Sequence, residues 1–100
     1  MDLDEVNESQ IVKKIKRYLE QAYPGVWYKI HGGPYQEAGI PDIVGCHAGQ
    51  FYAFEVKRPT RRHKVSMSQK YQLDRLEKAG AKCGVVTGIQ EVRAIMDPPK

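Results

Sequence analysis

Apolar residues recur along this chain with two different periods, and the period separates predicted helices from predicted strands. Three segments show the helical spacing of three and four residues: 5–22, 66–79 and 90–97. In two of them the opening pair, Asn7 with Gln10 or Ser66 with Gln69, has the spacing of a capping box. The stripes expected to face inward are Ile11, Ile15, Leu19 and Ala22 in the first helix, and Leu73, Leu76 and Ala79 in the second.

Four other segments are predicted strands, because they alternate or are apolar throughout and turn residues separate them: 26–31, 40–46, 51–57 and 82–87. The order of elements is therefore α-β-β-β-α-β-α. Two links are short enough for antiparallel neighbours, whereas the helical connection before the last strand favours a parallel crossover. The prediction is an α/β fold, a mixed four-stranded sheet flanked by helices, in a single domain of residues 1–100.

The composition is that of an ordinary folded protein, with 41% hydrophobic and 28% charged residues and a net charge of +4. Positive charge is concentrated directly after the third predicted strand, at Arg58, Arg61, Arg62 and Lys64. No acid occurs between residues 57 and 73. Such a cluster attracts polyanions such as nucleic acid, although a solvated loop can have the same composition.

The two cysteines, Cys46 and Cys83, lack the C-x-x-C spacing and stand among apolar residues, so we expect small buried thiols in a reducing compartment. The acidic start of the chain does not have the layout of a signal peptide. No apolar run approaches the length of a membrane span. We therefore expect a soluble, cytoplasmic protein without a membrane partner.

Alternation places the residues of the third predicted strand on two faces: Phe51, Ala53, Glu55 and Lys57 on one, and Tyr52, Phe54 and Val56 on the other. Glu55 and Lys57 interrupt a strand that is otherwise apolar on both faces. Burying charges is costly unless they pair or bind an ion. The two side chains are therefore either part of a reaction centre or a surface pair at an exposed strand end.

A second carboxylate stands in the neighbouring strand, where Asp42 interrupts an apolar run after a glycine-rich loop. If the two strands are adjacent, the turn at residues 48–49 brings Asp42 opposite the region of Glu55. Two converging carboxylates repel each other unless a cation lies between them, and oxygen ligands suit Mg²⁺ or Mn²⁺. With Lys57 beside them to hold water or offset phosphate charge, this combination is suited to phosphodiester hydrolysis.

These residues resemble a known signature. Pro41-Asp42, followed by Glu55-Val56-Lys57, is similar to the PD-(D/E)XK nuclease motif, and the order α-β-β-β-α-β is that of its restriction-endonuclease-like core. More narrowly, the chain resembles the VRR-NUC (virus-type replication-repair nuclease) domains. This resemblance extends from residue 8 to about residue 96 and includes the runs 39–42 and 54–57 and the pair Ser66 and Gln69.

The resemblance implies a role for each matching residue. Three groups would ligate Mg²⁺ or Mn²⁺: the carboxylates of Asp42 and Glu55 and the main-chain carbonyl of Val56. Lys57 would position the attacking water, and Glu8 would reach the metal from the first helix. Glu8 could instead be an ordinary acid in a first helical turn. Gln69 would border the active site, or serve as the capping partner of Ser66, or do both.

The resemblance also implies a substrate and an assembly. The chain would be a Mg²⁺-dependent, structure-specific DNA endonuclease, with the phosphate beside the basic residues Arg58, Arg61, Arg62 and Lys64. Stand-alone domains of this size look like homodimers that resolve Holliday junctions in DNA repair, and they suggest a phage or prophage origin. A flap, nick-directed or restriction-type nuclease and a non-catalytic DNA-binding module are the alternatives.

Overall fold

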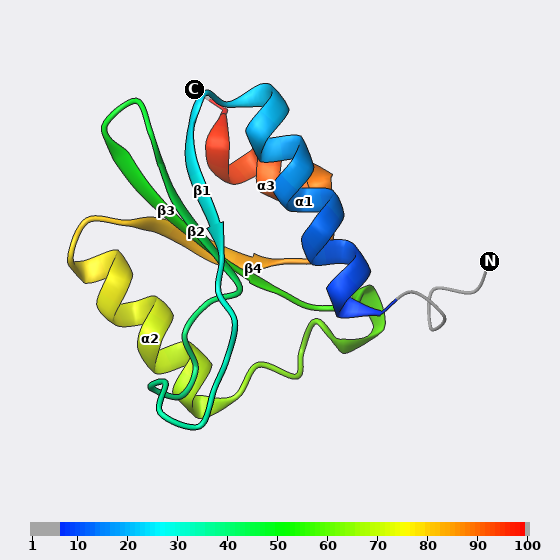
Figure 1. Cartoon of the computed structure of the whole chain (residues 1–100), viewed down its shortest axis with the longest axis vertical. Coiled ribbons are helices and arrows are strands. Elements are labelled where there is room, and N and C mark those ends of the chain that lie inside the picture. The colour runs from blue at the N-terminus through cyan, green and yellow to red at the C-terminus, as the bar shows by residue number, and fades with distance from the viewer. Residues whose placement is uncertain (1–6, 100) are drawn as a thin grey trace.

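The computed structural model describes residues 7–99. Its helices and strands are α1 (Glu8–Ala22), β1 (Gly25–Lys29), β2 (Ile43–His47), β3 (Gln50–Val56), α2 (Met67–Lys78), β4 (Lys82–Val86) and α3 (Ile89–Met96). The strands form one sheet in the order β1-β2-β3-β4. The first two pairings are antiparallel and the third is parallel. Helices α1 and α3 lie on one face and α2 on the other (Figure 1), which confirms the predicted fold class.

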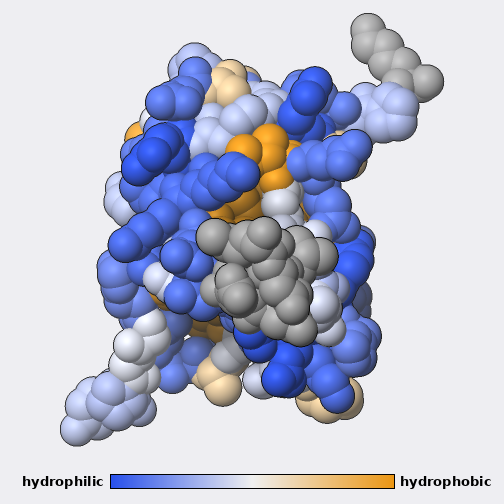
Figure 2. Space-filling view, turned by 90° about the vertical axis from the view of Figure 1, so that its right-hand side faces the viewer, coloured by the Kyte–Doolittle hydropathy of each residue, from blue (hydrophilic) through white to orange (hydrophobic). Residues whose placement is uncertain are grey.

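Helix α1 begins where its capping box predicts. The Asn7 side chain accepts a hydrogen bond from the main chain of Gln10, and the Gln10 side chain accepts one from the main chain of Asn7. The predicted start at residue 5 lies outside the described residues. Ile11, Ile15 and Leu19 are buried as predicted, but Ala22 is exposed because the helix ends there. The outward face of α1 is polar, and that side of the molecule is largely hydrophilic (Figure 2).

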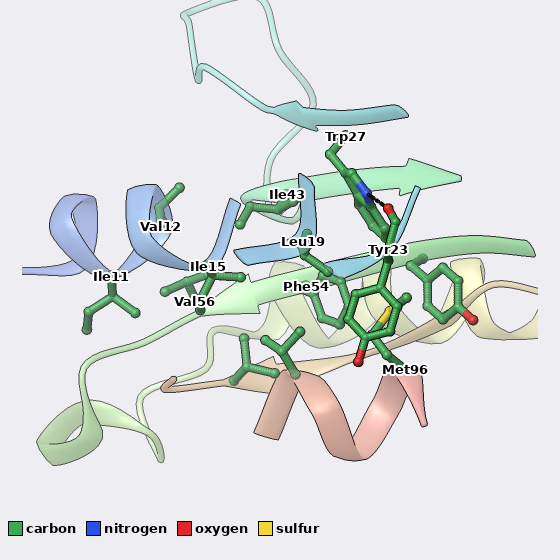
Figure 3. Packing of buried hydrophobic residues seen from close by; sticks show 13 residues of the cluster. Ile11, Val12, Ile15, Leu19, Tyr23, Trp27, Ile43, Phe54, Val56 and Met96 are labelled. Carbon is green, nitrogen blue, oxygen red and sulfur yellow. Dashed lines mark hydrogen bonds between the residues drawn. The ribbon is translucent and has the colours of Figure 1, made fainter. Parts of the chain in front are cut away.

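The main core lies between the sheet and the two helices α1 and α3 (Figure 3). Tyr52, Phe54 and Val56 of β3 point into this core. Ala53 and Glu55 are also buried, on the opposite face of the strand. The predicted alternation of the third strand is therefore correct. Burial of each large apolar side chain contributes roughly 1.5–3 kcal/mol, so this core holds β3 firmly in place.

Helix α2 buries a different face from the one predicted. Leu73 and Leu76 are only half-buried and Ala79 is exposed, whereas Gln72 is 5% exposed. The reason is that α2 covers only the β3–β4 part of the sheet and also packs against the loop before β2. A polar side chain is needed there to satisfy the loop main chain, and Gln72 donates a hydrogen bond to the carbonyl of Ala38.

Because α2 leaves the β1–β2 part of its sheet face uncovered, side chains there remain in solvent. Val26 and Tyr28 are more than half exposed. Cys46, on the same face, is exposed, so its predicted burial is wrong. Cys83 is partly buried, and its thiol contacts the carbonyl of Leu73. Within residues 7–99 no helix is long and apolar enough to cross a membrane.

The strand ends differ from the predicted ones at the positions that matter for chemistry. The second strand begins at Ile43 rather than at residue 40, so Asp42 lies just before it. Pro41 has no main-chain N–H to contribute to a strand ladder. The third strand ends at Val56, and Lys57 continues only through a hydrogen bond from its N–H to the Val86 carbonyl. Both charged residues thus project from strand ends.

Candidate active site

Asp42, Glu55 and Lys57 meet at the end of β3 as the sequence predicts. One carboxylate oxygen of Asp42 accepts a hydrogen bond of 2.7 Å from the main-chain N–H of Val56, which fixes Asp42 beside Glu55. The Lys57 ammonium lies 4.0 Å from Oε2 of Glu55, and its side chain is 11% exposed. Two acids from different segments and one amine therefore share a single sheltered corner of the molecule.

Glu55 is the most unusual group in this corner. It is 3% exposed, and its Oε2 accepts a hydrogen bond of 3.2 Å from the Gln69 amide. Its Oε1 is buried without a hydrogen-bond donor. Burial raises the pKa of Glu55 from an ordinary value of 4.5 to about 8, helped by the hydrogen bond and charge of Asp42 and opposed by Lys57.

The same atoms could hold a divalent cation. Within residues 7–99 no three His, Cys, Asp or Glu side chains gather into a metal site on their own. Main-chain oxygen and water would therefore complete the shell around Asp42 and Glu55, as is usual for Mg²⁺. The N–H of Val56 points to Asp42, and the N–H and C=O of a strand residue face the same side, so its carbonyl faces that way too. The donor set fits Mg²⁺ or Mn²⁺.

Glu8 and Gln69 border this centre in different ways. Glu8 is the first residue of α1, is partly exposed, and its charge also raises the pKa of Glu55. Asn7 caps the helix, and Glu8 stands in its first turn, where an ordinary acid is also favoured by the helix dipole. Gln69 combines both of its predicted roles: its side-chain oxygen accepts from the Ser66 main chain while its nitrogen donates to Glu55. The start of α2 is thereby joined to the buried carboxyl.

Comparison with known proteins agrees with this fold. Neither protein-family models nor curated sequences match the chain. A solved structure described as "VRR_NUC domain" superposes with a TM-score of 0.72 at 24% sequence identity, covering 93% of this chain and 97% of that one. This chain has the VRR-NUC fold. The predicted resemblance is thus confirmed at the level of the fold, and residues 39–69 of this VRR-NUC fold carry most of the candidate site.

Within the VRR-NUC fold, the four predicted DNA-binding residues occupy unequal positions. The segment after β3 contains a short 3-10 helix, Pro59–Arg61. The Arg62 guanidinium lies 2.9 Å from Oε2 of Glu91 and donates a 3.4 Å hydrogen bond to the Val85 carbonyl. Arg58 is partly buried and has an interaction of its own. Arg61 and Lys64 are exposed, with no ion-pair partner in the part of the chain that the structure describes.

Glu91 is a residue that the sequence reasoning missed. Its Oε1 accepts hydrogen bonds of 2.8 Å and 2.6 Å from the main chain and hydroxyl of Thr87, and its Oε2 pairs with Arg62. Glu91 therefore ties the basic segment to the start of α3. The sequence shows Glu91 as an acid in the first turn of the last predicted helix, but its partner Arg62 is too far away in sequence for the pair to be predicted.

Arg61 and Arg62 should respond differently to mutation. We expect Arg61→Ala to reduce the slope of log affinity for DNA against log salt by about 0.9, the value for one lost phosphate contact. Arg62→Ala should leave the slope nearly unchanged, because its charge is already paired, and should lower the free energy of unfolding by less than about 1 kcal/mol. Fluorescence anisotropy titrations between roughly 50 and 200 mM salt measure the slope for each of the two variants. Equal slope losses would contradict this assignment.

The raised pKa of Glu55 predicts how stability depends on pH. The folded chain keeps the Glu55 proton up to about pH 8, whereas the unfolded chain loses it near 4.5. Folding therefore takes up a proton between these values, and the free energy of unfolding falls as pH rises through that window. Without metal, the melting temperature should drop by at least about 5 °C, the shift expected for roughly 1 kcal/mol in a domain of this length.

Glu55→Gln provides the matched control, because the amide imitates the protonated carboxyl. Its melting temperature should depend much less on pH between roughly 5 and 8.5, a range that covers most of that window. Mg²⁺ should stabilise the native protein most at the alkaline end, where the proton has left, and should not stabilise Glu55→Gln. A native protein and variant with the same pH profile would disprove the assignment to Glu55.

Proposed function

We propose that this chain is a Mg²⁺-dependent endonuclease of the VRR-NUC type that hydrolyses phosphodiester bonds in DNA. The observation that carries the proposal is the buried Glu55 carboxyl, which has one oxygen without a donor, a second acid at its side and an amine 4.0 Å away. A structural role alone does not require two acids to be held together at this cost. Binding a cation and a phosphate relieves it.

Each residue of the centre has a separate role in the proposed hydrolysis. When bound at Asp42, Glu55 and the Val56 carbonyl, Mg²⁺ would supply the positive charge that eases ionisation of a water and offsets the charge of the phosphate. Lys57 holds the attacking water or the phosphate oxygen with its sheltered ammonium. Gln69 keeps the Glu55 carboxyl oriented toward Asp42. We propose that Glu8 acts at longer range, through water.

Exposed cations lie where the DNA backbone would pass. The basic segment directly follows the strand that carries Glu55, so its charges flank the proposed site of cleavage. Arg61 and Lys64 are the exposed members, and we propose them as phosphate contacts together with Arg58. Contacts of this kind bind duplexes of any sequence with an affinity that falls steeply with salt. Selectivity would then come from DNA shape.

Branched DNA is the proposed substrate, and a homodimer is the proposed form. The described residues hold one such centre, whereas cutting a four-way junction requires two cuts in opposed strands. A two-fold axis supplies two equivalent sites from one surface. Stand-alone domains with the resembled fold are of similar size, which favours Holliday-junction resolution in DNA repair.

A cleavage panel tests these statements separately. The native protein is incubated with a four-way junction, a 5′ flap, a nicked duplex and a linear duplex, in Mg²⁺ or in EDTA, and its mass is measured by light scattering. We expect the junction to be cut fastest, only with metal, by a dimer. Equal cutting of linear duplex would exclude junction resolution and leave a restriction-type nuclease. Preferred cutting of the flap or nick would favour that class instead.

A non-catalytic DNA-binding module is the remaining alternative. It predicts that the native protein binds DNA without cutting any member of the panel and that Glu55→Ala binds equally well. The nuclease proposal predicts that native protein cuts and Glu55→Ala does not, because the variant loses a metal ligand. The two proposals therefore differ in a single measurement on native protein.

A further inference from the structure

The loop between β1 and β2 begins and ends at the candidate active site. The N–H of Ile30 donates a 2.8 Å hydrogen bond to the carbonyl of Asp42, so the two ends of the loop meet there. Residues 31–41 leave the sheet between these points and return to it, reaching the start of α2 (Figure 1). We call residues 31–41 the arm. The arm therefore starts and ends beside the proposed cleavage site.

The arm is braced rather than loose. Gln72 donates a 3.2 Å hydrogen bond to the Ala38 carbonyl, and Arg75 forms a 3.1 Å ion pair with Glu37. At Gly39 the main chain approaches α2 so closely that a side-chain carbon there would overlap Ser68. These three consecutive contacts hold the second half of the arm against one side of α2.

The tip of the arm presents an aromatic ring to solvent. A hydrogen bond from the Gln36 N–H to the Gly33 carbonyl closes a turn, and Tyr35 within it is 100% exposed. The ring therefore adds nothing to the core. The charge around it suits DNA, because Glu37 is the one acid between residues 31 and 41 and Arg75 neutralises it. An uncovered ring in a turn of this braced arm, without net negative charge beside it, is suited to stacking on a nucleobase.

We infer that Tyr35 stacks on an unpaired or unstacked base of the DNA beside the cleaved phosphate. The inference rests on the proposed nuclease function and adds to it a residue that selects the substrate. Bases inside a regular duplex are covered by their neighbours, whereas bases at a branch point can be splayed out and take an aromatic partner. Tyr35 thus favours branched over linear DNA without reading its sequence.

The test compares Tyr35→Ala and Tyr35→Phe on a four-way junction and on linear duplex. Loss of one base–aromatic stack is worth about 1–3 kcal/mol, so Tyr35→Ala should cut the junction about 5- to 150-fold more slowly. Tyr35→Phe keeps the ring and should stay close to native, and Gln36→Ala serves as the control in the same turn. Since Tyr35 is fully exposed, Tyr35→Ala and Tyr35→Phe should melt as the native protein does.

A binding measurement separates this inference from the proposed function. A junction with 2-aminopurine at the branch point is titrated without metal, so that no cleavage is needed. Native protein and Tyr35→Phe should change its fluorescence alike, and Tyr35→Ala should not. The inference is overturned if Tyr35→Ala matches native protein in both assays, or if Tyr35→Phe fails as well, since the ring would then not be the active part. Failure of native protein to cut DNA, with the fluorescence change intact, would instead refute the nuclease proposal alone.

Discussion

Replacing Lys57 with alanine is expected to lower the rate constant for DNA cleavage about a thousandfold, the size of effect found when a positioned proton-transfer or charge-stabilising group is removed. The Lys57 side chain is 11% exposed and its ammonium lies 4.0 Å from Oε2 of Glu55, so the variant removes a sheltered positive charge from the centre. The variant also loses the one charge that lowers the pKa of Glu55. Its residual activity should therefore require a higher pH. Both effects are tested by single-turnover cleavage of the best substrate between roughly pH 6 and 9.5, which lies on both sides of the raised pKa of Glu55.

Lys64→Ala is the matched control for Lys57, because it removes an equal charge from the exposed basic segment. We expect Lys64→Ala to weaken DNA binding and to leave the single-turnover rate at saturation nearly native. Lys57→Ala should do the opposite. If Lys57→Ala changed only the affinity, its amine would be a phosphate contact like the others, and the proposed role in the chemical step would be wrong.

Gly39→Ala should destabilise the fold by about 2–5 kcal/mol, the sum of roughly 1–2 for a non-glycine residue in the left-handed region and 1–3 for overpacking. Gly39 has φ +83°, and an added Cβ would overlap the Ser68 main chain and lie 2.7 Å from the Gln69 nitrogen. To relieve this, the arm must move away from α2. Asp42 is only three residues further on, so cleavage activity should fall with stability. Urea denaturation measures the loss.

Two other glycines separate the causes of that loss. Gly49 has φ +78° but open space around it, so Gly49→Ala carries the backbone strain without the clash. Gly33 has open space and no such backbone conformation, so Gly33→Ala should be nearly neutral. We expect the order of destabilisation Gly39→Ala, Gly49→Ala, Gly33→Ala. Equal losses at Gly39 and Gly49 would mean that the approach to α2 is not close in solution.

The candidate active site could be predicted from the sequence because its geometry is set by short-range rules. Side-chain alternation placed Glu55 and Lys57 on one side of a strand and Val56 on the other. The turn at Ala48 and Gly49 fixed the β2–β3 register, which pairs Ile43 with Phe54 and leaves Asp42 next to the following residues. Both steps involve neighbours within a hairpin, where the chain has little freedom.

Some errors arose because strand ends and helix faces depend on what covers them. The second strand was predicted to include Asp42, yet strand pairing stops at Ile43, and this shift lets the Asp42 side chain reach the Val56 N–H. The second helix was expected to bury Ala79, but it buries Gln72 against the arm. Period alone identifies an apolar stripe and cannot show that a loop main chain will need a polar partner.

What the sequence by itself determined is the order of elements, the two capping boxes, the strand alternation and thereby the meeting of Asp42, Glu55 and Lys57. These features follow from contacts within a few residues or across one tight hairpin. Only the tertiary structure decided which charges are already paired and which polar groups are buried. Arg62 meets Glu91, and Glu37 meets Arg75, across 29 and 38 positions of the chain. The physical reason is that folding brings together charges that are far apart in the sequence. The order of the residues does not contain the distance between such charges in space.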